Sequence, residues 1–184
     1  MINANVLRDR SILKMIDENP GYYKWWCKKE ELDTILKELD VSFDSIKSYL
    51  EIENDLFCIY VGIAVKESVR SRLNWHVNDK HGRSQVIHGT LSTLRQSISS
   101  IAAHNQFDKQ ATDLFIDKLY VEWFYSQNAI GSDSAKTELE SIEKQMMSEY
   151  LRPLNIQNNN HPLAEQLKRK LKQLRKSSKH NTDF

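Results

Sequence analysis

Residues 56–64 spell LFCIYVGIA, an unbroken apolar run that contains the triplet YVG. A short continuous apolar run is typical of a β-strand that is covered on both faces. A second strand is indicated at residues 22–27, where aromatic side chains dominate, and a third at residues 117–125, which are rich in aromatics and valine. Three strands among many helical segments predict an α+β fold, in which a small three-stranded sheet is flanked by helices.

Apolar residues at helical spacing occupy most of the remaining chain. The predicted helices cover residues 5–18, 30–39, 68–78, 90–104, 131–151 and 163–179, with a short helix or loop at 42–50. Two groups of them form helical insertions, at about 29–50 and about 78–108. We predict one domain over residues 1–184, with a core at about 20–156 and a basic C-terminal helix and tail at 161–184.

The composition is that of an ordinary globular protein. The chain has 184 residues, of which 40% are apolar and 28% charged, with a net charge of +1. Cys27 and Cys58 stand alone in apolar surroundings, which indicates buried reduced thiols rather than a disulfide or a zinc site. The N-terminal residues lack the apolar core of a signal peptide, and no run approaches membrane-spanning length. We therefore expect a cytoplasmic protein that does not bind a membrane.

Two tyrosines, an arginine and a histidine are candidates for phosphodiester chemistry. Such hydrolysis needs a group that takes a proton from water, positive charge on the phosphate oxygens, and usually a metal ion. Tyr23 and Tyr60 lie on two predicted strands and could face one site, and nearby cations could lower a tyrosine pKa from about 10. Arg72 and His76 are four residues apart and share a helix face. Taken singly, a residue of this kind more often packs in a core or lies on a solvated helix face.

The order of these candidates resembles the GIY-YIG nuclease family. Members carry Gly-x-Tyr on a first strand and Tyr-x-Gly on a second. A helix with Arg and His follows, then a third strand, and finally a helix with Glu that ends near a Pro-x-x-Asn-like segment. The corresponding residues here are Gly21-Tyr22-Tyr23, Tyr60-Val61-Gly62, Arg72-Leu73-Asn74-Trp75-His76, Glu143 and Pro153-Leu154-Asn155. The likeness spans residues 21–64, 68–77 and 117–155, most of the chain.

The resemblance implies a metal-dependent hydrolysis of DNA. Glu143 would bind one Mg²⁺ or Mn²⁺ ion, and Tyr23 would be the general base with Tyr60 beside it. Arg72 and His76 would hold and polarise the scissile phosphate. Asn155 would position the site or the DNA backbone, although as a residue after a helix it is also typical of a turn.

Several features depart from the family pattern. Between Tyr23 and Tyr60 lie 36 residues, far more than in compact members, and the restriction-enzyme branch is known for such insertions. Ile63 follows the YVG triplet where many members have Lys. Arg70 fits the ungapped spacing, but Arg72 is preferred because Leu and His follow it as expected. If Tyr22 rather than Tyr23 faced the site, the general base would shift by one residue, since neighbouring strand residues point to opposite faces.

Two polar segments outside the core are candidates for DNA contacts. Residues 77–105 are polar and basic, which suits either backbone and groove contacts or a plain surface loop. Residues 163–179 carry seven Lys and Arg against one Glu, with Leu163, Leu167, Leu171 and Leu174 as an apolar stripe. This pattern predicts a helix docked on the body with a basic outer face that tracks phosphates, or else a solvated amphipathic tail.

The function that we predict from these features is a divalent-metal-dependent endonuclease that hydrolyses DNA phosphodiester bonds. Its size and insertion favour a type II restriction-like enzyme acting on double-stranded DNA, and the family allows a homodimer. One alternative is a GIY-YIG-like nucleic-acid-binding protein that has lost turnover. Another is an unrelated α+β protein, in which the candidate residues would be scattered through the fold rather than gathered in one pocket.

Overall fold

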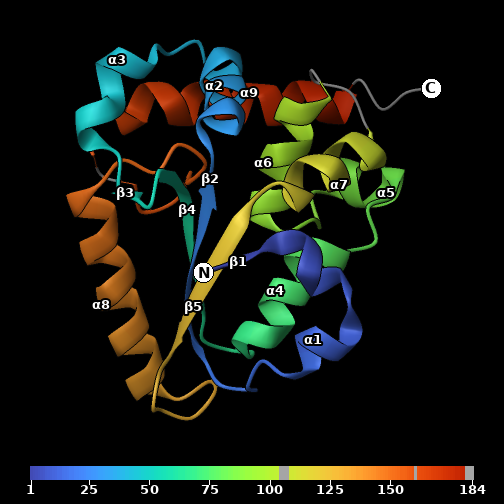
Figure 1. Cartoon of the computed structure of the whole chain (residues 1–184), viewed down its shortest axis with the longest axis vertical. Coiled ribbons are helices and arrows are strands. Elements are labelled where there is room, and N and C mark those ends of the chain that lie inside the picture. The colour runs from blue at the N-terminus through green and yellow to red at the C-terminus, as the bar shows by residue number, and fades with distance from the viewer. Residues whose placement is uncertain (104–107, 160, 181–184) are drawn as a thin grey trace.

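The strands form one antiparallel sheet with the long β2 at its centre (Figure 1). The computed structural model describes residues 1–103, 108–159 and 161–180. Within these residues the sheet has five strands in the order β1-β5-β2-β4-β3. Their bounds are β1 Ile2–Asn3, β2 Gly21–Cys27, β3 Ile52–Glu53, β4 Leu56–Ala64 and β5 Tyr120–Tyr125. The predicted number of three strands was wrong, because β1 and β3 have only two residues each and leave no periodic pattern in the sequence.

The helices surround this sheet and lie mostly where the sequence predicts them. Their bounds are η1 Ala4–Arg8, α1 Arg10–Lys14, α2 Lys29–Leu39, α3 Phe43–Ile46, η2 Lys47–Tyr49, α4 Val69–Asn78, α5 Arg83–His88, α6 Thr93–Ala102, α7 Lys109–Asp117, α8 Asp133–Glu149 and α9 Ala164–His180. In the described part of the chain, no helix combines the length and the apolar character needed to cross a bilayer. The predicted segments 78–108 and 161–184 lie partly outside the described residues.

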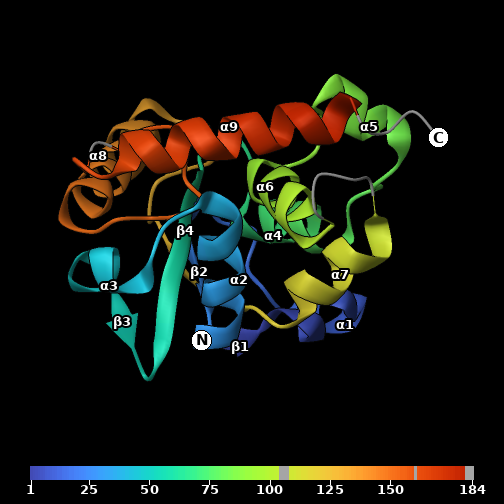
Figure 2. The ribbon, with the colours of Figure 1, turned by 90° about the horizontal axis from the view of Figure 1, so that it is seen from above.

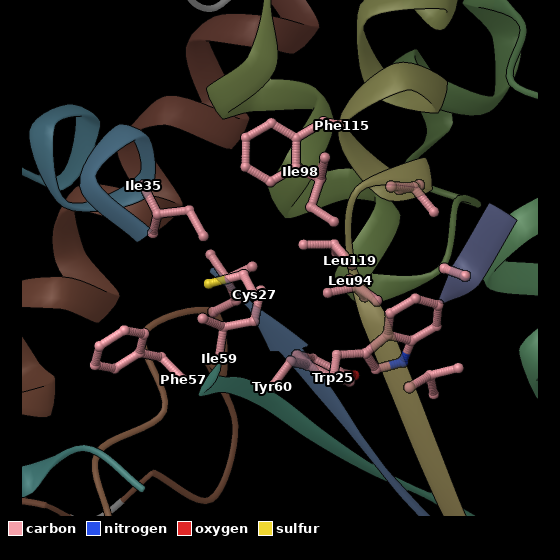
Figure 3. Packing of buried hydrophobic residues seen from close by; sticks show 14 of the residues in the cluster. Trp25, Cys27, Ile35, Phe57, Ile59, Tyr60, Leu94, Ile98, Phe115 and Leu119 are labelled. Atoms are coloured by element: carbon pink, nitrogen blue, oxygen red, sulfur yellow. The ribbon is translucent and has the colours of Figure 1, made fainter. Parts of the chain in front are cut away.

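Helices cover both faces of the sheet. Helix α8 packs on one face, where Met147 contacts the side chains of Trp26, Cys58 and Val61. The opposite face carries the main core, to which α2, α4, α6, α7 and α9 contribute (Figures 2 and 3). Cys27 lies in this main core, so the two cysteines are buried on opposite faces as free thiols, as predicted.

Three predicted boundaries differ from the structure for local reasons. The helix predicted over 5–18 is divided into η1 and α1 at Asp9, whose carboxylate accepts a hydrogen bond from the Ser11 amide and caps α1. Strand β5 starts at Tyr120 rather than at 117, because α7 continues to Asp117. Leu163 precedes α9 and is exposed, whereas Leu167, Leu171 and Leu174 are buried as predicted.

A β-bulge in β4 determines which side chains share a face. Trp25 pairs with Tyr60, whereas Trp26 pairs with Cys58, so Ile59 is the extra residue. Without a bulge, successive side chains would alternate strictly between the two faces. Because of it, Ile59 and Tyr60 both belong to the main core, as Figure 3 shows. The bulge therefore places Tyr60 on the same face as Tyr23.

Gly21 allows helix α4 and strand β5 to approach the start of β2. A Cβ atom at this position would lie 2.0 Å from the carbonyl oxygen of Phe124 and 2.9 Å from Cγ2 of Val69. Phe124 is in β5, and Val69 is the first residue of α4. A side chain here would push apart the strand pair and the helix that carries Arg72.

We expect Gly21→Ala to lower the free energy of unfolding by about 3 kcal/mol or more, because a methyl group has no space against a backbone oxygen. Urea denaturation of both proteins measures the difference. Gly82→Ala is the matched control, since its new methyl group would meet only the end of the flexible Gln85 side chain. Equal stability of the two variants would contradict the close approach at Gly21.

Candidate active site

A cavity of about 690 Å³ brings together five of the six candidate residues. They come from β2, β4, α4 and α8, elements that are far apart in the sequence. The residues that line the cavity are Tyr23, Tyr60, Gly62, Ile63, Arg72, His76, Thr93, Glu140, Glu143, Lys144, Gln157 and Asn158. Asn155 is the sixth candidate and does not line it. The scattered arrangement expected of an unrelated α+β protein is therefore not observed.

Gly62 provides the space in which the Tyr23 ring lies. The two residues pair directly across β2 and β4. A Cβ atom on Gly62 would lie 2.4 Å from Oη and 2.5 Å from Cζ of Tyr23. The glycine of the YVG triplet is thus a close-approach residue, and it allows the Tyr23 hydroxyl to lie over β4 beside Tyr60.

A buried hydrogen-bond chain holds the Tyr23 hydroxyl. His76 Nε2 is 2.8 Å from Tyr23 Oη, and His76 Nδ1 is 2.8 Å from Ser92 Oγ. Ser92 precedes α6, and its Oγ also accepts the amide hydrogen of Arg95 as the helix cap. Tyr23, His76 and Ser92 are all at most 2% exposed.

Both ring nitrogens of His76 have hydrogen-bond partners inside the protein. Ser92 Oγ accepts a hydrogen bond from the Arg95 amide, and its own proton can be donated to His76 Nδ1. In that tautomer the proton of the neutral imidazole is on Nε2 and is directed at Tyr23 Oη. The opposite tautomer, in which Tyr23 donates to Nε2 and Nδ1–H donates to Ser92, uses the same two contacts. The part of His76 in holding a phosphate stays a prediction.

Burial keeps the three ring groups of the site uncharged. Desolvation, followed by Arg72 and Arg95, lowers the pKa of His76 well below its usual value. Desolvation, followed by the neighbouring Tyr60, raises the pKa of Tyr23 well above its usual value. The pKa of Tyr60 rises to about 12 for the same first reason, while Arg72 acts in the opposite direction. Additional positive charge in the cavity would be required to generate a phenolate.

The structure distinguishes between the two arginines and between the two tyrosines that the sequence left open. Arg70 donates hydrogen bonds to the Lys14 and Ile16 carbonyls and pairs with Glu18, outside the cavity. Arg72 lines the cavity, with its Nε 3.1 Å from Glu67 Oε1 and its guanidinium over the Trp75 ring.

Tyr22 points to the other face of the sheet. Its ring stacks on Phe124 at a centroid distance of 4.8 Å, while the Tyr23 ring enters the cavity. Arg72 and Tyr23 are therefore the members of each pair that line the cavity.

Glu143 could bind one divalent ion together with water. It lies on α8 one turn after Glu140, and both carboxylates line the cavity. Asn158 Nδ2 donates to Glu143 Oε2 at 2.7 Å, which leaves Oε1 for a ligand. Desolvation raises the pKa of Glu143, which indicates a carboxylate that lacks a full cationic partner. No group of three or more His, Cys, Asp or Glu suited to a metal occurs among the described residues. The donor set fits a Mg²⁺ ion that keeps most of its waters.

Asn155 fixes the segment after α8 to strand β4. The Val61 amide donates to Asn155 Oδ1 at 2.9 Å, and Asn155 Nδ2 donates back to the Val61 carbonyl at 2.8 Å. Its side chain thus pairs with the residue between Tyr60 and Gly62, in the manner of a neighbouring strand. The same segment leads directly to Gln157 and Asn158 in the cavity. Asn155 therefore holds the segment after α8 against β4 and does not itself line the cavity.

The segment at 77–105 has two parts in the structure: residues 91–101 are mostly buried, whereas Lys80, Arg83, Ser84, His88 and Thr90 are exposed. A DNA contact by these exposed residues stays a prediction. Arg95 is completely buried, and His81 is only 3% exposed. Arg95 donates to the His76 and Val77 carbonyls at 3.0 and 3.2 Å, to His81 Nδ1 at 3.1 Å, and to the Asp113 carboxylate. This network ties α6 to the end of α4, so the insertion supports His76.

Sequence reasoning missed several residues of the cavity. Thr93, Lys144, Gln157 and Asn158 line it although no motif marks them. Glu140 carries a usable signal, since it is three residues before Glu143 and shares its helix face. The role of Ser92 depends on contacts between α4 and α6, which the sequence alone does not reveal.

The chain belongs to the GIY-YIG family: residues 21–177 match the GIY-YIG catalytic domain. GIY-YIG proteins are nucleases that act on DNA, and a nuclease-type function follows for this chain. No curated protein and no solved structure gives a significant match. The family match extends through most of α9, so the C-terminal helix is part of the domain.

We expect the free energy of unfolding to fall as the pH drops below about 6.5, the usual pKa of histidine in an unfolded chain. Unfolded His76 binds a proton there that the buried residue cannot bind, which costs about 1.4 kcal/mol per pH unit. His81, with its pKa lowered to about 4 by burial, acts in the same direction.

Urea denaturation of wild type and His76→Gln at a series of pH values measures this effect. Below about pH 6, the slope of the free energy of unfolding against pH should be smaller in the variant than in wild type by about 1.4 kcal/mol per pH unit. His88 is the matched control site, because it is not part of the buried chain. Identical slopes for wild type and His76→Gln would show that His76 becomes protonated in the folded protein.

Proposed function

We propose that this protein is a divalent-metal-dependent endonuclease that hydrolyses phosphodiester bonds in DNA. The observation that carries the proposal is the convergence of Tyr23, Tyr60, Arg72 and Glu143 on one solvent-reachable cavity. The membership in a family of DNA nucleases supports the same chemistry.

Glu143, assisted by Glu140 and water, would hold the Mg²⁺ or Mn²⁺ ion. A bound divalent ion would supply positive charge to the phosphate oxygens and to the leaving oxygen. Arg72 would place its planar guanidinium against the non-bridging phosphate oxygens. Lys144 lines the same cavity and adds positive charge on the α8 side.

Tyr23 would take the proton from the attacking water at its Oη atom. Its elevated pKa means that the hydroxyl carries its proton in the free protein. Positive charge brought into the cavity would lower that pKa, so that the hydroxyl loses its proton to solvent and becomes a phenolate. The Nε2–H tautomer of His76, which a hydrogen bond from Ser92 Oγ to Nδ1 favours, would stabilise that phenolate. His76 is thereby a positioning residue for Tyr23.

The long helical insertion favours a restriction-like enzyme that acts on double-stranded DNA. Helices α2 and α3 occupy the 36 residues between Tyr23 and Tyr60, and α5 and α6 follow α4. Neither insertion lines the cavity except through Thr93 of α6. The residues proposed for the chemistry therefore belong to the family core, and the insertions pack around that core.

We expect Glu143→Ala to abolish cleavage of plasmid and genomic DNA in Mg²⁺ or Mn²⁺ while the affinity for DNA changes by less than about threefold. The reason is that the variant loses the metal ligand and keeps the cationic groups that bind phosphate. Glu149→Ala is the matched control, since Glu149 is an exposed residue of the same helix that does not line the cavity.

Discrete fragments from wild type and from Glu149→Ala alone would agree with the proposal. Loss of binding together with cleavage in Glu143→Ala would contradict the metal-ligand role. Wild-type protein that binds DNA but cuts no substrate would favour the alternative of a nucleic-acid-binding relative without turnover.

We expect Tyr23→Phe to reduce kcat by at least about 100-fold with little change in KM, because it removes the atom that accepts the proton. Tyr22→Phe, on the opposite face of the sheet, should keep wild-type kcat. Thermal unfolding of both variants checks the fold, since an unpaired His76 Nε2 costs about 1–3 kcal/mol. A wild-type kcat in Tyr23→Phe would show that another group is the general base.

A further inference from the structure

A second cavity lies along α9 and is lined mainly by cations. Its volume is about 360 Å³, and the lining residues are Gln96, Ile156, Lys172, Arg175, Lys176 and Lys179. No acidic residue is among the described residues that line it. The four cations are spaced i, i+3, i+4 and i+7, so they form one stripe along the helix.

This basic cavity is adjacent to the candidate active site. Thr93 and Gln96 are one turn apart on α6 and line the first and the second cavity, respectively. The consecutive residues Ile156 and Gln157 are divided between the cavities in the same way. Arg175 also lowers the pKa of Tyr60 through its charge, which requires the two groups to be near each other. A chain that occupies the first cavity can therefore continue into the second.

A comparison with another basic surface shows why the α9 cavity is the stronger candidate. A cavity of about 420 Å³ near α1 is lined by Arg8, Arg10, Lys14 and Arg70. There Arg8 pairs with Asp117 at 2.6 Å, and Arg70 pairs with Glu18 at 2.6 Å. In the α9 cavity, Arg175 instead donates to the neutral amide of Gln96 and keeps its full charge available to an anion.

We propose that the α9 cavity binds a backbone phosphate of duplex DNA that flanks the phosphate to be cut. This inference rests on the proposed function and adds to it the path of the strand beyond the active site. Arg175, held by Gln96, presents its guanidinium, and Lys172 and Lys176 add positive charge at the exposed edge. In this proposal, the part of the predicted basic outer face of the C-terminal helix that binds phosphate is the one stripe of cations next to the buried leucines.

The test compares two double variants that each remove two positive charges from α9. Lys172→Gln/Lys176→Gln changes the cavity, and Arg169→Gln/Lys170→Gln is the control, because neither of its residues lines the cavity. Arg175 is left in place, since it is partly buried and bonded to Gln96. Thermal unfolding of both proteins verifies that α9 remains docked.

The measurement is the dissociation constant for a fluorescent DNA duplex, in EDTA so that no cleavage occurs, over a range of salt concentrations. Loss of the one phosphate contact should reduce the slope of log Kd against log salt by about 0.9 in the cavity variant. The control should change the slope much less. With Mg²⁺ present, the cavity variant should keep the wild-type rate at saturating DNA and show a raised KM.

Equal slopes for the two double variants would overturn the proposal, because α9 would then act only through its general charge. Tighter binding of single-stranded RNA than of the duplex, with the same dependence on Lys172 and Lys176, would overturn the assignment to duplex DNA. Wild-type protein that binds no DNA at all would instead overturn the proposed function. If the wild type binds DNA and the cavity variant has the same slope of log Kd against log salt as the wild type, the proposed function stands and only the α9 site is ruled out.

Discussion

The contact between the Tyr23 ring and the backbone of Gly62 is the constraint on which the rest of the site depends. A side chain at position 62 would occupy the space of the Tyr23 hydroxyl. The Ile59 bulge adds the second requirement, because it turns Tyr60 to the face where Tyr23 lies. Once both tyrosines share this face, α4 can contribute Arg72 and His76 from one side and α8 can contribute Glu143 from the other.

Burial gives the free site a consistent electrostatic character. Desolvation is the largest cause of the pKa shift for Tyr23, Tyr60, His76 and Glu143, and in each case it favours the uncharged form. Arg72 and Lys144 bring positive charge to the same cavity. Further positive charge in the cavity would favour the ionised forms of Tyr23, Tyr60 and Glu143.

The sequence predicted the long elements well. Apolar patterning located β2, β4 and α9, and the family motifs singled out Tyr23, Tyr60, Arg72, His76 and Glu143, which the structure gathers in one cavity. The two short strands were missed because two residues carry no period. The contact of His76 with Ser92 was not foreseen, since Ser92 caps another helix, α6.

Buried polar residues were the main source of error. Arg95 and His81 look like solvent-exposed basic residues in the sequence, and only their tertiary contacts show that they are internal. Asn155 was correctly singled out, but its bonding to both polar atoms of Val61 could not be foreseen. Such pairings join residues that are 94 positions apart, which local patterns do not encode.

The bulge also determines where insertions and deletions can be tolerated in this chain. Helices α2 and α3, and likewise α5 and α6, leave and rejoin the core at fixed points, so homologous chains could gain or lose residues there without moving a tyrosine. In β4, by contrast, closing the bulge with every residue kept would place Ile59 opposite Trp25 and turn Tyr60 toward α8. The pairing register of this strand is therefore as much a part of the site as the letters that it contains.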